Sequence, residues 1–536
     1  MGIFSKHSLS RRGSTSSPTS SPTTSPATSP AAEQKVTFKA CFLGLIASMG
    51  GFMFGYVSGQ ISGYFNMSDY ARRFGDKDGK FSSSRQGAIV GLLAVGCLFG
   101  ALIIGMAVDR FGRRLTISFS AFWACIGIIV EITSEHAWYQ LAIGRFVTGL
   151  SIGALSVVVP MYQSESAPVV VRGILVSCYQ LFVTIGIWVS NMVNWGTHST
   201  YNNSAQWRIT LGLGFLWAII LGVGVLLLPE SPRHAYRNGR EEEARKIIAG
   251  LAGVDPNHAS INDQITEMRV QLEEENLAAG VKWHEIFTGP RMMYRTVLGM
   301  VIMAGQQLCG VNYYFYYGTT VFQSTGITDS YVTQIVLGVV NVVSTFPGLW
   351  IAQNVGRRKA LIGGAVGMMV CFFIYAFVGH LKMDFADPFN TPAIGKVLIV
   401  FACLDIFFFA ATWGPLAWLV VAEMYPPKYR AHCSAVATAS TWFWNFMVGF
   451  FTPYITNDID FYYGLVFAVL CGCLAIITFF FLVETRGRSL EEIDTMYLSY
   501  VNPIKSASWQ GKPAPTPNPD GMQESGSEAG HHKESE

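Results

Sequence analysis

Six amide side chains lie inside long apolar segments of this sequence, where polar groups are costly. They are Gln180, Gln306, Gln307, Asn312, Asn341 and Asn445. An amide both donates and accepts hydrogen bonds, so a group of amides suits an uncharged ligand that is rich in hydroxyl groups. Trp418 adds an aromatic face on which a ring could stack. The alternative, for any one amide alone, is a hydrogen bond that joins two membrane helices.

The clustering of these residues around one glycine favours a ligand site. Gln306 and Gln307 come just before Gly310, where a helix can unwind and free backbone carbonyls for a ligand. Three tyrosines follow within two helical turns, at positions 313, 316 and 317. The pair Gly414 and Pro415 predicts a similar break in a later apolar segment.

Two ionisable residues also lie in apolar segments. Arg145 and Asp405 are candidates for a functional role, because a charge inside a membrane span is expensive. Asp405 could hold a proton or pair with a neighbouring group. The alternative is that it lies in water near the outer interface of the membrane.

The composition indicates a membrane protein. Of the 536 residues, 51% are hydrophobic and 13% are charged, and the mean hydropathy is +0.34. About twelve apolar runs have nearly the ~20 residues that a helix needs to cross the hydrocarbon core of a bilayer. Backbone groups in lipid must bond to one another, so the runs must be helices. We therefore expect an all-α membrane protein with about twelve transmembrane helices, surrounded by a lipid bilayer.

The distribution of basic residues predicts the orientation of these spans. Arginines and lysines follow the even-numbered spans, and the positive-inside rule then places these loops and both termini in the cytoplasm. The outer loops after spans one and five each carry an acceptor sequence for N-glycosylation, at Asn66 and Asn202. The Ser/Thr/Pro-rich start does not resemble a cleavable signal peptide.

Repeated motifs divide the chain into two similar halves. The segment 105–114, which ends in GRR, is echoed by 349–358, and Glu165 and Arg172 are matched by Glu423 and Arg430 at the same spacing of seven. We expect a disordered cytoplasmic tail at 1–36, six-helix bundles at 37–229 and 291–485, cytoplasmic helices at 230–290, and a cytoplasmic tail at 486–536. Such a repeat is typical of transporters in which one bundle rocks against the other.

Opposite charges gather where both halves are expected to meet the cytoplasm. The candidate gate residues are Asp109, Arg113, Arg114, Glu165, Arg172, Glu230, Arg357, Arg358, Glu423, Arg430 and Glu484. We hypothesise that they pair while the cytoplasmic side is shut, and so bias the protein towards the outward-open state. The second half has Gln353 in place of Asp109, so we expect its latch to be weaker. The alternative is ordinary positive-inside charge, which does not require the glutamates.

Eight motifs in order resemble those of the sugar porter family of the major facilitator superfamily, and most of all those of fungal hexose transporters. They lie at Gly51–Gly63, Gly105–Arg114, Gly144–Gly149, Pro160–Gly173, Pro229–Arg233, Gln306–Tyr317, Trp413–Trp418 and from Glu484 onwards. The resemblance implies alternating-access transport of glucose or a related hexose across the plasma membrane. In similar transporters the positions matching the six amides and Trp418 contact the sugar. An acid that some members carry at position 410 is replaced here by alanine.

The resemblance also bears on energy coupling. Proton-driven members have FGYDxG in the first span, with an aspartate that answers the arginine matching Arg145, whereas this chain reads FGYVSG and has Val57 there. We therefore expect facilitated diffusion, with proton symport through Asp405 and Arg145 as the alternative. A glucose sensor that does not transport is a further alternative, although such sensors typically have a longer tail than the roughly fifty residues after Arg486.

The sequence gives no sign of an enzyme. Gly75–Lys80 falls one residue short of a phosphate-binding loop, and no two histidines have metal-ligand spacing on a helix. The ten cysteines lie mostly in apolar runs, which favours small buried hydrophobic residues over disulfides or metal ligands. We expect no cofactor, no metal and no nucleic-acid partner, and we expect a single chain to suffice for the activity.

Overall fold

The structure is a computed structural model that describes residues 37–76, 79–168, 171–278, 284–323, 329–384, 391–426 and 428–509. The expected tail at 1–36 and the end of the second tail, 510–536, lie outside the described residues. The first bundle comprises α1 (Phe38–Tyr64), α2 (Ser68–Phe74), α3 (Ser83–Phe111), α4 (Arg113–Ile132), α5 (Trp138–Ser166), α6 (Arg172–Thr200) and α7 (Ala205–Leu226).

In the described part of the connection between the two bundles, the chain forms four helices. They are α8 (Pro232–Arg237), α9 (Glu241–Ala252), α10 (Ala259–Ala278) and α11 (Glu285–Thr288). The second bundle comprises α12 (Met292–Leu308), α13 (Val311–Gln323), α14 (Ser330–Asn354), α15 (Arg357–Lys382), α16 (Pro392–Phe408), α17 (Gly414–Met424), α18 (Arg430–Ile459) and α19 (Tyr463–Phe481). The chain then forms α20 (Leu490–Leu498) and a 3₁₀ turn, Pro503–Ser508.

The expectation of about twelve membrane spans is confirmed. Among the described residues, ten helical stretches are long and apolar enough to cross a membrane, and one of them, His432–Phe481, contains most of α18 and all of α19. The helices α12 and α13 have 17 and 13 residues and together form one broken span. Counting α18 and α19 separately and α12 with α13 as one therefore gives twelve.

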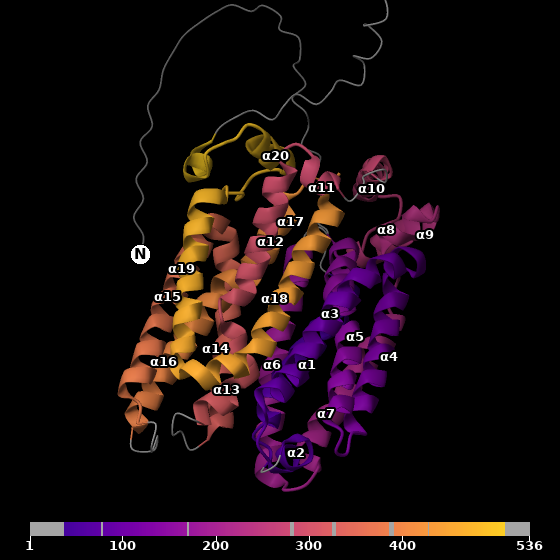
Figure 1. Cartoon of the computed structure of the whole chain (residues 1–536). Coiled ribbons are helices and arrows are strands. Elements are labelled where there is room, and N and C mark those ends of the chain that lie inside the picture. Colours follow the sequence, from indigo (N-terminus) through magenta and orange to yellow (C-terminus); the bar gives the residue numbers. More distant parts are fainter. Residues whose placement is uncertain are drawn as a thin grey trace, which may run out of the picture.

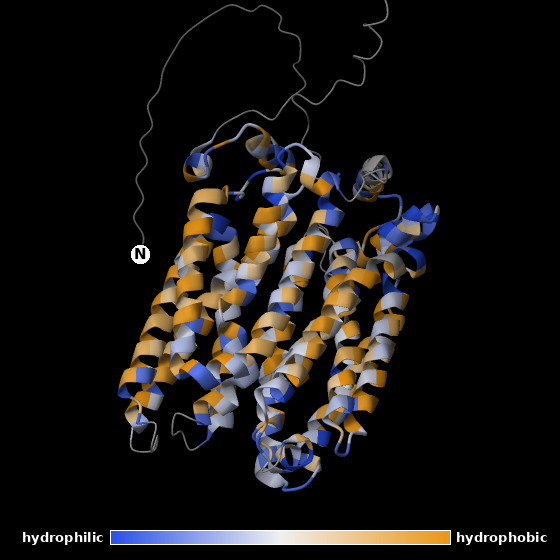
Figure 2. Cartoon of the chain, viewed as in Figure 1, coloured by the Kyte–Doolittle hydropathy of each residue, from blue (hydrophilic) through white to orange (hydrophobic). Residues whose placement is uncertain are grey.

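The two bundles lie side by side in Figure 1, with the first in indigo to magenta and the second in orange to yellow. Helices α8 to α11 and α20 lie at one end of the bundles, which we call the charged end, and α2 lies at the other, which we call the α2 end (Figure 1). Figure 2 shows hydrophobic residues along the length of the long helices and hydrophilic residues gathered at both ends.

Exposed apolar side chains mark the surface that faces lipid. Leu102 and Ile103 on α3, Phe122 on α4 and Trp350 on α14 are large, hydrophobic and exposed. In water such a surface would be unfavourable, whereas hydrocarbon solvates it. The ten cysteines are free thiols, and five of them are buried.

Small residues let α3 and α5 pack closely. A side chain at Gly96 would collide with the carbonyl of Phe146, and one at Gly149 would collide with the carbonyl of Leu93. The glycines therefore serve helix packing in this membrane protein.

Hydrogen bonds join the two bundles at the α2 end. The hydroxyl of Tyr331 donates to the carbonyl of Gly63 at 2.7 Å, and Nδ2 of Asn457 donates to Oγ of Ser83 at 2.7 Å. Ser62 Oγ also accepts from the backbone N–H of Thr319 at 3.2 Å. These contacts close the interface between the bundles at the α2 end.

Candidate functional site

Gln307 lies at the centre of a buried network of amides. Its Oε1 accepts hydrogen bonds from Nδ2 of Asn312 at 2.6 Å and from Nδ2 of Asn445 at 2.9 Å. Its Nε2 donates to Oε1 of Gln306 at 3.1 Å. Asn445 also contacts the hydroxyl of Tyr316, with 3.1 Å between its Nδ2 and the phenolic oxygen. Residues from α12, α13 and α18 therefore meet in one polar cluster inside the second bundle.

A break in the backbone brings these amides together. Helix α12 ends at Leu308 and α13 begins at Val311, and Gly310 between them has a φ of 83°. Glycine adopts this left-handed conformation readily, whereas other residues are strained in it. The break predicted at Gly310 is therefore present, and it lets Gln307 and Asn312 share a hydrogen bond across it.

A second irregular segment lies beside the first. The chain forms a π-helical turn at Phe409–Trp413 between α16 and α17, which fits the break expected near Gly414 and Pro415. Nε2 of Gln306 donates to the carbonyl of Gly414 at 2.9 Å. π-helical turns occur often at functional sites, and here the turn connects to the amide network.

The other three proposed ligand residues do not join this network. Asn341 is buried on α14, Gln180 is half-buried on α6, and Trp418 on α17 is 38% exposed. Within the part of the chain that the structure describes, none of their side chains hydrogen-bonds to Gln307 or its partners. The sequence placed Tyr316 in the cluster around Gly310 but did not predict its hydrogen bond with Asn445. Its spacing of four from Asn312 places the two on one helical face.

The gate residues of the first bundle form a cluster at the charged end. Nε of Arg113 lies 2.9 Å from Oε2 of Glu165, and both side chains are almost fully buried. Glu230 accepts the backbone N–H groups of Arg113 at 2.9 Å and of Arg114 at 3.2 Å, and so caps the start of α4. Arg114 also donates to the carbonyl of Leu226 at the end of α7.

The second bundle repeats this arrangement. Nη2 of Arg357 lies 2.8 Å from Oε1 of Glu423, and Glu484 accepts the backbone N–H groups of Arg357 at 2.9 Å and of Arg358 at 3.2 Å. Arg358 donates to the carbonyl of Phe479 near the end of α19 at 2.6 Å, as Arg114 does at the end of α7. Each cluster therefore ties three segments of its own bundle together.

The ion pairs of Glu165 and Glu423 lie within each bundle and do not join the two bundles. Glu165 and Glu423 pair with arginines of their own bundle, so these contacts do not by themselves require the bundles to approach each other. Arg172 and Arg430 donate to the carbonyls of Ala167 and Tyr425, each five residues earlier in the chain.

The first cluster contains more groups than the second. Asp109 lies 2.8 Å from Nη1 of Arg237 and 3.9 Å from Nη1 of Arg113. Nδ1 of His234 lies 3.2 Å from Nη1 of Arg113. Burial lowers the pKa of His234 from its ordinary value, and the nearby carboxylate of Glu230 partly offsets this effect. A neutral imidazole can accept from Arg113, whereas a protonated one cannot.

The buried Arg145 has an acidic neighbour that the sequence did not reveal. Val57, at the position of the expected aspartate, is buried and aliphatic. Glu131 on α4 is also buried and interacts electrostatically with Arg145, while its Oε1 accepts from Oγ1 of Thr148 at 2.6 Å. In the sequence, the one sign of this acidic neighbour is a single glutamate near the end of an apolar run.

Asp405 on α16 is fully buried, and neither of its carboxylate oxygens has a hydrogen-bond partner among the described residues. Its surroundings include Cys371 and Cys471, both within electrostatic reach. The alternative that placed Asp405 in water is therefore wrong. An ionisable residue buried in a membrane span is costly, which makes Asp405 a candidate for a functional role.

The two glycosylation sequences differ in accessibility. Nδ2 of Asn66, the atom to which a glycan attaches, is buried and has no hydrogen-bond partner in the described chain, whereas Asn202 is exposed. The geometry therefore favours Asn202 over Asn66 as an acceptor.

Characterised relatives share most of the chain. A "High-affinity fructose transporter ght6" of Schizosaccharomyces pombe is 43% identical over 452 residues, which cover 83% of this chain and 84% of the relative. A "Low-affinity glucose transporter HXT1" of Saccharomyces cerevisiae is 43% identical over 453 residues, which cover 83% of this chain and 79% of the relative.

Solved structures share the fold. The proton:xylose symporter XylE of the major facilitator superfamily, bound to 6-bromo-6-deoxy-D-glucose, gives a TM-score of 0.72 at 23% identity and covers 86% of this chain and 100% of that one. An inward-open structure of XylE from E. coli gives a TM-score of 0.70 at 23% identity and covers 85% of this chain and 99% of that one. The family model described as "Sugar (and other) transporter" matches residues 43–497. The chain therefore belongs to the "Sugar (and other) transporter" family.

Proposed function

We propose that this protein carries glucose or a related hexose across the plasma membrane by alternating access of its two bundles. The observation that carries this proposal is the amide network around Gln307, which lies where α12 breaks into α13. The names of the fructose and glucose transporters that match most of the chain support a hexose as the substrate.

The network suits a sugar because its members are neutral and bond to one another. A hexose hydroxyl can replace each amide-to-amide hydrogen bond with one that the sugar accepts or donates, so binding costs little and stays reversible. Trp418 is exposed enough to offer a ring face from α17. Gln180 and Asn341 would complete the site from α6 and α14 when the bundles close around the sugar.

The two ends of the bundle interface suggest how access alternates. Contacts such as Tyr331 with Gly63 close the interface at the α2 end, which faces outward if both termini are cytoplasmic. At the charged end, the clusters around Glu165 and Glu423 hold each bundle together as a rigid body. Rocking of one bundle against the other would then exchange which end is open.

Facilitated diffusion accounts best for the first bundle. Val57 cannot take up a proton, so Arg145 lacks the acid on α1 that proton-driven relatives carry. A second candidate is proton symport, and the buried and unpaired Asp405 is the observation that favours it. Glu131, buried near Arg145, offers a further protonatable group.

Complementation tests the proposal. The chain is expressed in a cell stripped of its own hexose carriers, and growth on glucose as sole carbon source is measured. Restored growth and uptake are expected. A protein that reaches the plasma membrane and changes glucose-dependent gene expression without restoring uptake would instead be a sensor.

A further inference from the structure

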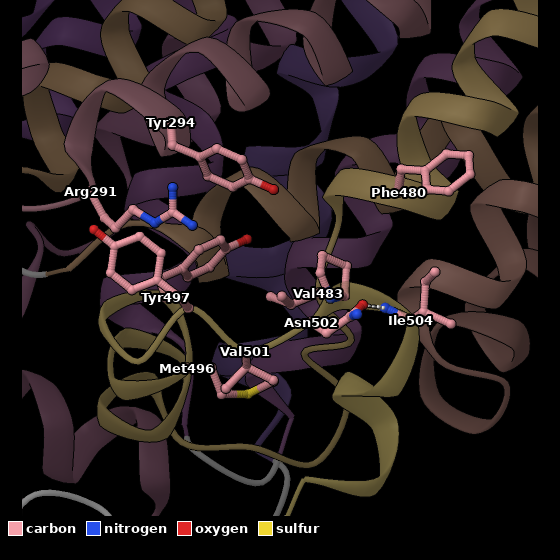
Figure 3. A pocket seen from close by; sticks show the side chains of 11 residues that line it. Arg291, Tyr294, Phe480, Val483, Met496, Tyr497, Val501, Asn502 and Ile504 are labelled. Atoms are coloured by element: carbon pink, nitrogen blue, oxygen red, sulfur yellow. Dashed lines mark hydrogen bonds between the residues drawn. The ribbon is translucent and has the colours of Figure 1, made fainter.

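A cavity of about 400 Å³ lies at the charged end, between the start of α12 and the chain that follows α19. Figure 3 shows Arg291 in its wall, with Tyr294 and Tyr497 close by and Asn502 on the far side. This cavity is separate from the amide network, since the two share no residues.

Arg291 is held in place in an unusual way. Its φ of 58° is left-handed, a strained conformation for a residue other than glycine. Its guanidinium carbon lies 3.9 Å from the ring centroid of Tyr500 and 4.7 Å from that of Tyr294. Aromatic faces on a guanidinium fix its position and leave its edge available for hydrogen bonds.

The charge of Arg291 is not neutralised by a described carboxylate. Its neighbour Arg295 lies 2.6 Å from Oδ1 of Asp494, which satisfies that charge. No such ion pair forms at Arg291 within the described chain, and its Nε is buried without a hydrogen-bond partner there. Among the described residues, the cavity wall therefore holds a cation that has no carboxylate partner.

An apolar groove continues from the same arginine. A second cavity, of about 590 Å³, shares Arg291 and Tyr294 with the first and runs between α12 and α19, lined by Val297, Val301 and Ile477 among others. Val297 and the neighbouring Met293 are exposed on the surface that faces lipid. A site with a cation at its head and an apolar groove below it matches an amphiphile with an anionic head.

We propose that this surface binds an anionic phospholipid, with its phosphate at Arg291 and an acyl chain in the groove between α12 and α19. The leaflet is the one that meets the charged end, cytoplasmic in the orientation proposed above. That leaflet is rich in anionic lipids that attract basic residues next to membrane helices. The lipid would hold the segment after α19 against α12, because Tyr500 and Tyr294 stack on the same guanidinium.

The test is native mass spectrometry of the purified protein with phosphatidylserine or phosphatidylcholine. We expect wild-type protein to retain phosphatidylserine preferentially, and Arg291→Gln to reduce this preference about fivefold, since one basic residue at an anionic leaflet contributes about 1 kcal/mol. Arg110→Gln is the matched control, because Arg110 also lies at the charged end and stacks on a ring, that of Phe111, but lines neither cavity. It should leave the preference unchanged.

Further arms separate the alternatives. Val297→Trp should fill the groove and lower retention of phosphatidylserine while leaving Arg291 in place, which gives a second test if Arg291→Gln fails to fold. Glycerophosphoserine, which has the head without acyl chains, should not be retained. Equal phosphatidylserine preference in wild type and Arg291→Gln would overturn the proposal, as would retention of glycerophosphoserine as strong as that of the lipid.

Discussion

Nδ2 of Asn445 donates to Oε1 of Gln307 across 2.9 Å, although 138 positions separate the two residues along the chain. The bond joins α18 to the end of α12, next to the break at Gly310. Because Oε1 of Gln307 also accepts from Asn312, a single oxygen connects three helices. A ligand that replaces either donor would therefore change the contacts among α12, α13 and α18.

Removal of the Gln307 amide should weaken sugar uptake. Gln307→Ala deletes a group that donates to and accepts from sugar hydroxyls, a loss of about 1–3 kcal/mol or roughly 5- to 150-fold. The measurement is initial uptake of labelled glucose at equal surface expression. Gln323→Ala, at an exposed amide at the end of α13, is the control and should transport normally. Wild-type kinetics in Gln307→Ala would contradict the assigned role.

The break in α12 should be sensitive to a single methyl group. A Cβ at Gly310 would lie 2.6 Å from Cγ of Phe467 and would also be strained by the left-handed φ, so Gly310→Ala should reduce both folded protein and uptake. Gly414→Ala is the matched control, since its Cβ would have no atom closer than 3.4 Å. Thermal unfolding and uptake of both variants test this, and equal behaviour of the two would count against a strained break.

Loss of the Glu423 carboxylate should favour the state that is open at the charged end. Glu423→Gln removes the charge that holds Arg357 and Thr485 together and so loosens the charged end of the second bundle. The shift should be about fivefold, as expected for a partly exposed pair worth about 1 kcal/mol.

Accessibility of a cysteine placed at the charged end measures the population of that state. Glu165→Gln should give a smaller change, because Asp109 and His234 still contact the cluster of Arg113. Glu242→Gln, at an exposed site on α9, is the neutral control. Unchanged labelling in Glu423→Gln would argue against a role in gating.

Acidification should weaken the first cluster through His234. The pKa of this imidazole is lowered by burial, so the unfolded chain binds a proton more readily, and stability is lost as pH falls below the unfolded pKa of about 6.5. Thermal unfolding between about pH 7.5 and about pH 5.5 should show a smaller loss for His234→Gln than for wild type. His284→Gln, at an exposed site, should behave as wild type. Parallel pH dependence of the unfolding temperature in His234→Gln and wild type would contradict a role of His234 in the acid sensitivity.

Proton coupling can be read from the pH of the medium. Glucose added to an unbuffered suspension of cells with this protein as sole carrier should leave the pH unchanged, because facilitated diffusion moves no proton with the sugar. Prompt alkalinisation would show symport instead. If the alkalinisation is lost in Asp405→Asn while uptake remains, Asp405 is the proton carrier. If it is lost in Glu131→Gln while uptake remains, Glu131 is the proton carrier.

Much of the fold and part of the site could be predicted from the sequence. Apolar length gives the spans, because hydrocarbon permits only internally bonded helices, and Gly310 marks the break since few residues tolerate its φ. The identity of hydrogen-bond partners could not be predicted. Arg172 lies seven residues from Glu165, yet the glutamate pairs with Arg113 from another helix, and this depends on packing across the bundle.

The burial of individual polar groups also could not be predicted from the sequence. Asn66 and Asn202 have equivalent acceptor sequences, but only the arrangement of the surrounding helices decides that Nδ2 of Asn66 is enclosed. Glu131 appeared as a lone acid in an apolar run, and its proximity to Arg145 follows from the packing of α4 against α5.

Flux through the purified protein is the decisive test of hexose transport. The protein is reconstituted into liposomes loaded with unlabelled D-glucose, and entry of external labelled D-glucose is followed with and without a protonophore. We expect transient accumulation of label by counterflow that the protonophore does not change, that is absent for L-glucose and that is strongly reduced in Gln307→Ala. If the protein mediates entry of neither D-glucose nor any other hexose, it is not a hexose carrier.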